Sequence, residues 1–464
     1  METLMTNRTA PSDPPPARPP WVMLKPGVNN KVDSDSAVAD AKTRAASCTS
    51  SGQSFSISFE LAAPPATSSC YCDWIGGALG SGSGSDDDGR RHRLYPDIDQ
   101  SKNLSIIAAH DDSLLLKMGL PDARDGFRYT NTYDYFLYET SGGARPPSLW
   151  LLPGCYVSRQ VHRKEVARKV PTRCDRPRSL HNGDAGDTGV LRCGDGEGEF
   201  LVAQLEVIYE DGGGPHDTAE ICVLRPGGGD WEVKQLPIVH HEGGELLSWP
   251  NHDAAVPVGT RFMCWVDYVN GFFMCDMVES AAGAGSPKVQ YVPLPVPPIE
   301  QRHRNNDRPC LLNCRNLAAA GPDAVRFMSI ARRCCCGGPG KTGCESSRFA
   351  FKVTTWTLTL RTEGPMTWTK DGVLDCDELW QLPSYGRLPR VVPRYPIMSS
   401  ENPDIVCFLV REEINLVDDD ADRTEWMLRI DTRTKELLSA VRGDKYTYYI
   451  DYRVRAKLSW QLGL

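Results

Sequence analysis

The chain has 464 residues, 24% of them charged, and a formal net charge of −8 at pH 7. A chain of this length can bury a core that needs neither disulfides nor metal ions for stability. It lacks the excess of Lys and Arg that tracks nucleic-acid phosphates, so we expect no nucleic-acid partner.

The amino-terminal residues contain no apolar segment typical of a secretory signal, and no long apolar run predicts a membrane span. We therefore expect a cytoplasmic or nuclear protein without a membrane partner. The 17 cysteines are odd in number and irregularly spaced, which indicates free thiols in a reducing compartment. Residues 1–20, rich in Pro and polar side chains, are predicted to form a disordered tail.

From residue 21 onward the chain consists of short apolar runs typical of β-strands. The sequence SFSISFE at 54–60 alternates apolar and polar residues, which predicts a half-buried strand. Residues 76–90 are rich in Gly, Ser and Asp and predict a flexible insertion. LSIIAAHDDSLLLKM at 104–118 predicts a hairpin with a His-Asp-Asp turn. Further strands are expected within 133–139, 147–153, 198–210, 219–238, 261–279, 288–296, 324–334, 348–360, 404–413 and 424–441.

Turn signals join several of these strands. Asn270-Gly271 lies between two aromatic-rich runs, which predicts a hairpin whose central residues have positive φ. Asp431 to Lys435 predicts a polar turn between two strands. Helical patterning is confined to 161–170 and 375–383, and Pro383 ends the second segment.

The strand groups repeat along the chain, beginning near residues 200, 262, 326 and 405. A radial repeat of short strands indicates an all-β β-propeller of about five or six blades of antiparallel strands. We expect one propeller-like domain over residues 21–445, followed by a carboxy-terminal extension, 446–464. The alternative fold is a pair of packed β-sandwich units.

SIARRCCCGGPGKTGCESS, at 329–347, most resembles a chemical motif. Gly340-Lys341-Thr342 matches the end of a phosphate-binding P-loop, but Cys335 occupies the position of its first glycine. A strand pattern follows the segment, whereas a P-loop needs a helix N-terminus there. The segment is therefore interpreted as a connection between two strands of one blade.

Cysteines around the same segment permit a zinc hypothesis. Cys310 and Cys314 form a pair with spacing suited to zinc, and Cys334 and Cys344 could complete four ligands. Cys335 and Cys336 could replace Cys334, but neighbouring strand residues point to opposite faces. Because free cysteine also packs as a small apolar residue, we assign no metal ligand and no cofactor, and the zinc question stays open.

Histidines give equally weak site signals. His110, His240 and His241 stand near carboxylates, but the first lies on an expected hairpin turn and the other two lie near Gly-rich sequence. Known nucleophile and zinc-protease motifs are absent from the sequence, so we assign no catalytic residue.

Several segments resemble a family of grass proteins known as domain of unknown function 1618. The resembling segments are DYFLYE, PSLWLLPG, FMCWVDYVNGFFMCDM, VQYVPLPV and the run from Trp356 to Val410, within roughly residues 20–445. The resemblance implies a cytosolic or nuclear plant protein without an established activity. DYFLYE and SLWLLP also resemble propeller regions that follow F-boxes in plant ubiquitin-ligase receptors, although this chain has no recognisable F-box helices.

Two functional hypotheses follow from this sequence. The first is a monomeric, non-catalytic module that binds an unknown protein or peptide through loops at one end of the propeller, with Trp150, Trp249 and Trp380 as candidate anchors. The second is a hydrolase or transferase whose site in the central channel would use the histidines and nearby carboxylates.

Overall fold

The structure is a computed structural model that describes residues 21–30, 40–75, 104–120, 132–140, 146–154, 186–194, 199–208, 218–225, 227–240, 252–278, 287–297, 311–334, 347–411, 425–443 and 454–456. The predicted tail 1–20, insertion 76–90 and helix 161–170 lie outside these residues. Within the described residues strands prevail, and the only helices are α3 (Cys376–Trp380), η2 (Leu311–Asn313) and η4 (Pro383–Tyr385). None of these helices is long and apolar enough to cross a membrane.

The described strands form sheets of nine, eight, four and four strands. In chain order they are six groups of four consecutive strands, called blades 1 to 6 here, and one final strand. Blades 1 and 2 contain β1 (Val22–Asn30), β2 (Asp40–Cys48), β3 (Ser54–Glu60), β4 (Thr67–Ile75), and β5 (Leu104–His110), β6 (Ser113–Leu120), β7 (Thr132–Glu139), β8 (Ser148–Leu151). Blades 3 and 4 contain β9 (Thr188–Arg192), β10 (Phe200–Ile208), β11 (Thr218–Leu224), β12 (Glu232–His240), and β13 (Ala254–Val258), β14 (Phe262–Asp267), β15 (Gly271–Asp276), β16 (Val289–Pro293). Blades 5 and 6 contain β17 (Arg315–Ala319), β18 (Ala324–Arg332), β19 (Phe351–Thr359), β20 (Thr369–Asp375), and β21 (Arg394–Met398), β22 (Ile405–Arg411), β23 (Glu425–Asp431), β24 (Glu436–Arg442).

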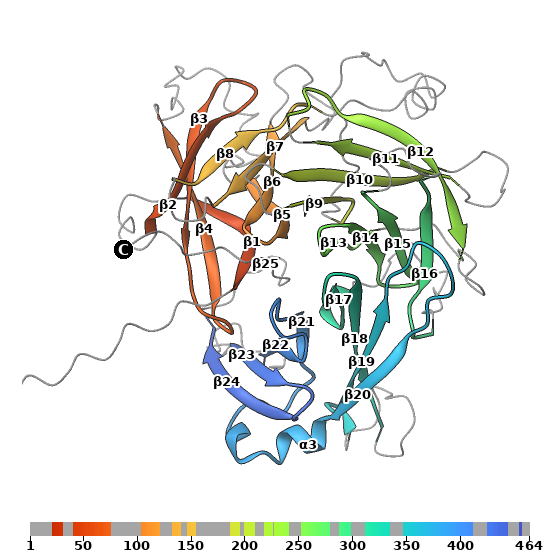
Figure 1. Ribbon diagram of the computed structural model, residues 1–464. Helices are drawn as coiled ribbons and strands as arrows, with labels where there is room; N and C mark the ends of the chain where they lie inside the picture. The colour runs from red at the N-terminus through yellow and green to blue at the C-terminus, as the bar shows by residue number, and fades with distance from the viewer. Residues whose placement is uncertain are drawn as a thin grey trace, which may run out of the picture.

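Figure 1 shows the blades arranged around a common centre, with β1, β5, β9, β13, β17 and β21 nearest to it. The first strands of successive blades contact one another from β1 to β21. In blades 2 to 6 the strand order follows the chain, whereas blade 1 has the order β2-β3-β4-β1. The expected all-β, propeller-like fold is therefore confirmed.

Six apolar clusters occupy the six interfaces between neighbouring blades. Representative buried pairs from blades 1–2, 2–3, 3–4, 4–5, 5–6 and 6–1 are Phe55 and Phe136, Leu137 and Val202, Leu205 and Trp265, Phe272 and Phe327, Phe351 and Phe408, and Met23 and Leu409. Because the sixth cluster joins the last blade to the first, the core forms a closed ring rather than two separate sandwiches.

Neighbouring residues on one strand serve opposite interfaces. In β22, Val406, Phe408 and Val410 contribute to the cluster with blade 5, while Cys407 and Leu409 face blade 1. This alternation follows from the two-residue period of a strand. It explains why the strands read as continuous apolar runs, since a blade between two others is buried on both faces.

The expectation for 54–60 is wrong about one face of the strand. The strand itself, β3, is confirmed, but it is not half-buried: Ser56 and Ser58 on its polar face are 1% and 7% exposed. Arg44 Nε donates a hydrogen bond to Ser56 Oγ at 3.1 Å, so the polar face meets a hydrogen-bonding neighbour instead of solvent.

The Asn270-Gly271 hairpin is confirmed, but its expected backbone conformation is wrong. β14 and β15 pair with Asp267 opposite Gly271, and neither Asn270 nor Gly271 has a positive φ. Instead Asp267 Oδ1 accepts a hydrogen bond from Val269 N at 2.8 Å, which closes the turn. Gly271 is required by space, since a Cβ there would lie 2.5 Å from the backbone oxygen of Val292.

The two ends of the described chain meet in blade 1. β25 (Val454–Ala456), within the expected carboxy-terminal extension, pairs antiparallel with β1, bringing Arg455 opposite Met23. Arg455 Nη1 donates a hydrogen bond to the backbone oxygen of Met398 in blade 6 at 3.2 Å. The final strand thus ties blade 1 to blade 6 beside the apolar cluster that closes the ring.

Candidate binding groove on the arm between blades 5 and 6

Residues 375–394, called the arm here, run from the last residue of β20 in blade 5 to the first residue of β21 in blade 6 and contain the predicted helix at 375–383. The helix is realised as α3, which starts at a capping box: Asp375 accepts a hydrogen bond from Asp377 N at 3.0 Å, and Glu378 Oε2 accepts one from Asp375 N at 3.0 Å. The sequence then turns into η4 at Pro383, whose missing N–H suits a helix start.

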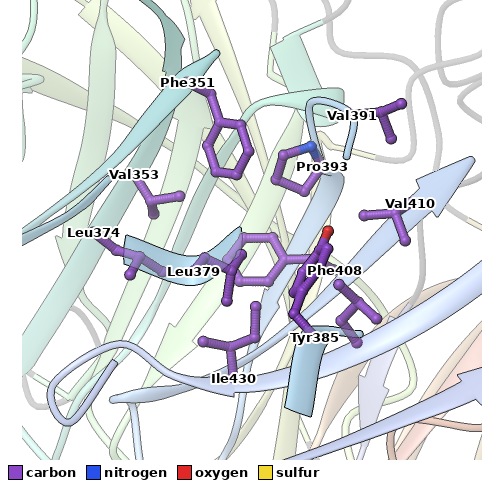
Figure 2. Close-up of a pocket in the computed structure, with 11 residues that line it drawn as sticks. Phe351, Val353, Leu374, Leu379, Tyr385, Val391, Pro393, Phe408, Val410 and Ile430 are labelled. Atoms are coloured by element: carbon purple, nitrogen blue, oxygen red, sulfur yellow. The ribbon is translucent and has the colours of Figure 1, made fainter. Parts of the chain in front are cut away.

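Apolar side chains hold the arm against both blades. Leu379, Tyr385 and Val391 are buried in the cluster that joins blades 5 and 6. Tyr385 Oη donates to the backbone oxygen of Pro389 at 2.8 Å, and burial raises the pKa of its phenol to about 12. Figure 2 shows these side chains facing Phe351 and Phe408 around a small cavity. Its volume is about 10 Å³, room for about one water molecule, so it cannot hold an organic ligand.

The outer side of the arm is different, because it carries an open groove of about 430 Å³. The groove residues are Asp377, Trp380, Gln381, Leu382, Pro383, Gly386 and Arg390. Trp380 is only partly buried, and its ring packs edge-on against Phe351 with the ring centroids 5.8 Å apart. Gly386 ends η4 with φ of 48°, a conformation that glycine adopts without strain. Figure 1 shows α3 at the outer rim of the ring, between blades 5 and 6.

Ion pairs clamp the helical end of the arm to both blades. Arg333, after β18, donates through Nη2 to Asp375 Oδ1 at 2.7 Å and to Asp377 Oδ2 at 2.5 Å. Lys435, in the β23–β24 turn of blade 6, lies 2.6 Å from Glu378 Oε1, and this hydrogen bond lowers the pKa of Glu378. Burial opposes ionisation of Asp375, but hydrogen bonds from Arg333 and Asp377 N outweigh it and lower its pKa.

The same helix start brings together Asp375, Cys376 and Asp377, three possible metal ligands. Arg333 already occupies both carboxylates. Burial raises the pKa of the Cys376 thiol to about 11, so at neutral pH it is protonated and a poor ligand. These interactions favour a structural ion-pair cluster over a metal site.

The structure describes only two of the cysteines of the zinc hypothesis. Cys310, Cys335, Cys336 and Cys344 lie outside the described residues. Cys314 and Cys334 are described, and neither belongs to a group of three possible ligands among the described residues. Ser347 Oγ donates to Cys334 Sγ at 3.5 Å. Residues 335–346, including Lys341, are likewise outside, but β18 and β19 on either side pair antiparallel, as expected for a strand connection and not for a P-loop.

The candidate channel histidines do not share one place in the fold. His110 ends the inner strand β5, where its Nδ1 accepts a hydrogen bond from Arg192 N at 2.8 Å. His240 ends β12, the last strand of blade 3, and its ring packs on Tyr291 at 5.9 Å. His241 lies outside the described residues. Because β5 and β12 are at opposite edges of neighbouring blades, His110 and His240 do not form one site.

A different His-carboxylate pair escaped the sequence analysis. His252 Nδ1 lies 2.8 Å from Asp187 Oδ1, and the ring is 4% exposed and packs edge-on against Phe273. Among the described residues His252 Nε2 has no hydrogen-bond partner, so no hydroxyl or thiol stands ready as a nucleophile. The pair therefore links blades 3 and 4. No sequence signal could reveal it, since the two residues are 65 positions apart.

The three candidate tryptophan anchors have different surroundings. Trp249 lies outside the described residues. Trp150 in β8 is 57% exposed, on the outer strand of blade 2. Trp380 lines the groove on the arm. The sequence does not identify Gln381, Pro383 and Arg390 as groove residues, because their exposure depends on how the arm packs against two blades.

Comparisons with known proteins add little about activity. No curated protein matches the chain. Among solved structures, the WD40 domain of SCAP from fission yeast is similar with a TM-score of 0.28 and 10% identity, covering 94% of this chain and 90% of that one. Xylan beta-1,4-xylosidase from Bacillus Halodurans C-125 is similar with a TM-score of 0.23 and 11% identity, covering 72% and 54%. Such low TM-scores give these likenesses no weight.

The family resemblance inferred from the sequence is supported in part. The plant origin and the likeness to F-box-associated propellers stay predictions. Residues 265–407, which include the whole arm, match the model of a family described as "Protein of unknown function (DUF1618)".

Proposed function

We propose that the protein is a non-catalytic module that binds a protein or peptide segment in the groove on the outer side of the arm. The observation that carries the proposal is the open groove of about 430 Å³ beside the partly buried Trp380. Its volume falls in the range of roughly 300–1,000 Å³ that binding pockets occupy. Tryptophan is among the residues that contribute most binding energy at interfaces.

Rigidity of the arm supports the same proposal. Its inner side is packed into the core, and its helical end is held by Arg333 and Lys435. A groove that is already ordered loses little conformational entropy when a partner binds. The proposal includes a monomer in the cytoplasm or nucleus, where buried thiols such as Cys264 and Cys376 would stay reduced.

The alternative, a hydrolase or transferase in the central channel, has weaker support. Its histidines lie on separate strands, and the buried Asp187–His252 pair adjoins no nucleophile among the described residues. General acid–base chemistry needs such groups within hydrogen-bond reach of one substrate atom.

Selection of a random peptide library displayed on phage, with the purified full chain as bait, tests the proposal. We expect enriched peptides whose affinity falls about thirtyfold or more in Trp380→Ala, the loss of about 2 kcal/mol typical of a binding hot spot. Gln381→Tyr, an exposed change that narrows the groove without adding charge or touching the core, should weaken the same peptides. Trp150→Ala removes an equally large exposed side chain elsewhere and should leave binding unchanged.

Thermal melting of each variant checks that the fold is intact. Failure to enrich any peptide contradicts the proposal. So does a set of enriched peptides that bind both groove variants as tightly as the unmodified protein, because their site must then lie elsewhere.

A further inference from the structure

Charge is distributed unevenly along the arm. At its helical end Asp375, Asp377 and Glu378 are all paired with cations, as described above. Beyond η4 the sequence RLPRVVPR carries Arg387, Arg390 and Arg394 and no acidic residue. All three arginines are exposed. The groove thus lies between a helix start whose three carboxylates share two cations, Arg333 and Lys435, and a basic segment.

Two of these arginines have no carboxylate of their own. Among the described residues neither Arg387 nor Arg390 forms an ion pair, in contrast to Arg333 and Lys435 nearby. Arg390 lines the groove, and its Nη2 donates to the backbone oxygen of Trp380 at 3.4 Å. This contact holds the guanidinium beside the tryptophan and leaves its other N–H groups available, because a guanidinium has five donors.

The basic segment also contrasts with the chain as a whole, whose formal net charge is −8. A local cluster of cations on an acidic protein attracts anionic groups over a short range only. At physiological salt, exposed charges more than about 8 Å apart are largely screened from each other. Three arginines cannot track the backbone of a nucleic acid as an extended basic face does. A short acidic segment of a protein fits this arrangement better, because arginine forks pair with carboxylates in two parallel hydrogen bonds.

We propose that the groove selects an acidic peptide segment, with Trp380 contacting an apolar or aromatic side chain of the partner and Arg387 and Arg390 pairing with its carboxylates. This inference rests on the proposed function and adds the chemical class of the partner.

Three synthetic peptide pools test the inference by fluorescence anisotropy with the purified full chain. The pools share their apolar and aromatic positions and differ elsewhere, carrying Asp and Glu, Lys and Arg, or Ser and Gln. We expect the acidic pool to bind best and its affinity to fall with added salt. A labelled oligothymidine serves as a second anionic probe and should bind at least about tenfold more weakly than the acidic pool.

Charge reversal locates the interaction. In the double variant Arg387→Glu/Arg390→Glu we expect the acidic pool to lose at least about tenfold in affinity and the basic pool to gain, since like charges placed together repel. Arg361→Glu is the matched control. Arg361 is exposed and follows the end of β19 at Thr359. The arm starts at the opposite end of β19, where Asp375 pairs with Lys352, so Arg361 lies away from the groove. This control should bind the acidic pool normally.

The outcomes separate the inference from the proposed function. If all three pools bind equally and Trp380→Ala weakens them all, the groove is a binding site and the inference about charge is wrong. An oligothymidine that binds as tightly as the acidic pool, and loses affinity in the double variant, assigns the arginines to nucleic acid and overturns the acidic peptide. If no pool binds, or if binding is insensitive to Trp380→Ala, the proposed function fails, and the inference fails with it.

Discussion

Replacing Met23 by alanine tests whether the ring is closed between blades 6 and 1. Met23 is 0% exposed and belongs to the closing cluster with Trp21 of blade 1 and Leu409 of blade 6. Loss of a fully buried side chain of this size removes about 1.5–3 kcal/mol of apolar transfer free energy. The cavity left behind raises the usual cost of such a change to about 2–5 kcal/mol. We expect the free energy of unfolding to fall by about 3 kcal/mol.

Urea unfolding followed by the summed fluorescence of the chain's 11 tryptophans measures this change. Met23→Leu keeps the volume and should cost less than about 1.5 kcal/mol. Leu438→Ala, at a residue that is 44% exposed, is the control and should change stability by no more than about 0.5 kcal/mol. A free energy of unfolding for Met23→Ala within about 0.5 kcal/mol of that of the unmodified chain would refute the closed ring. In an open ring Met23 would have few buried contacts, and its removal would cost little.

Two further changes probe local structure. Gly271→Ala should destabilise the protein by more than about 1 kcal/mol in the same urea assay, because the new Cβ would clash with the backbone oxygen of Val292. An unchanged urea midpoint would contradict this close approach of β15 and β16. Asp375→Asn tests the pH dependence of the arm. The folded-state pKa of Asp375 is lowered, so its contribution is present above the unfolded value and is lost as pH falls through the folded value. Stability of the unmodified chain should therefore decline in acid below about pH 4 more steeply than that of the Asn variant, and parallel acid limbs would contradict the assigned role.

Strands could be predicted from the sequence, because burial on both faces produces apolar runs. The expected grouping is shifted by one strand: the runs that begin near residues 200, 262, 326 and 405 are β10, β14, β18 and β22, the second strands of blades 3 to 6, because the first strands have only five residues each. β3, the hairpin of β5 and β6, and the hairpin of β14 and β15 all lie where the pattern predicts them. The pattern does not show which long side chains of adjacent strands cover a polar face. The alternation at 54–60 therefore predicts one exposed face, although Ser56 and Ser58 are buried and Arg44 of β2 donates to Ser56.

The turn at Asn270-Gly271 illustrates a different limit. Asn-Gly is compatible with a positive-φ turn, and the local sequence contains no competing signal strong enough to reject it. The choice is made by Asp267, whose carboxylate accepts from Val269 N, and by Tyr291 and Val292 of β16, which leave no room for a side chain at position 271. The local sequence predicts the hairpin, whereas contacts with Asp267 and β16 determine the backbone conformation of its turn.

For the candidate site the sequence yielded Trp380 and a short helix at 375–383, but not the groove. A groove forms only where the exposed side chains of several segments are arranged around it. It requires that Leu379 and Tyr385 point into the core, so that Gln381, Pro383 and Arg390 remain outside. Spacing along one short helix cannot determine this, because the helix has only five residues and its orientation is set by two blades.

The charge layout of the arm has a physical origin that connects its fold to its proposed partner. A helix start favours acidic residues, which here are Asp377 and Glu378 after the capping Asp375. Those charges are needed within the protein, since Arg333 and Lys435 use them to fix the arm on blades 5 and 6. Arg387 and Arg390, which follow η4, form no ion pair among the described residues, and both are exposed. In the proposed function, the carboxylates of the arm serve its stability, these two arginines select the partner, and Trp380 supplies affinity. On this reasoning, breaking the Lys435–Glu378 pair should loosen the arm, whereas reversing Arg387 and Arg390 should change only what the groove binds.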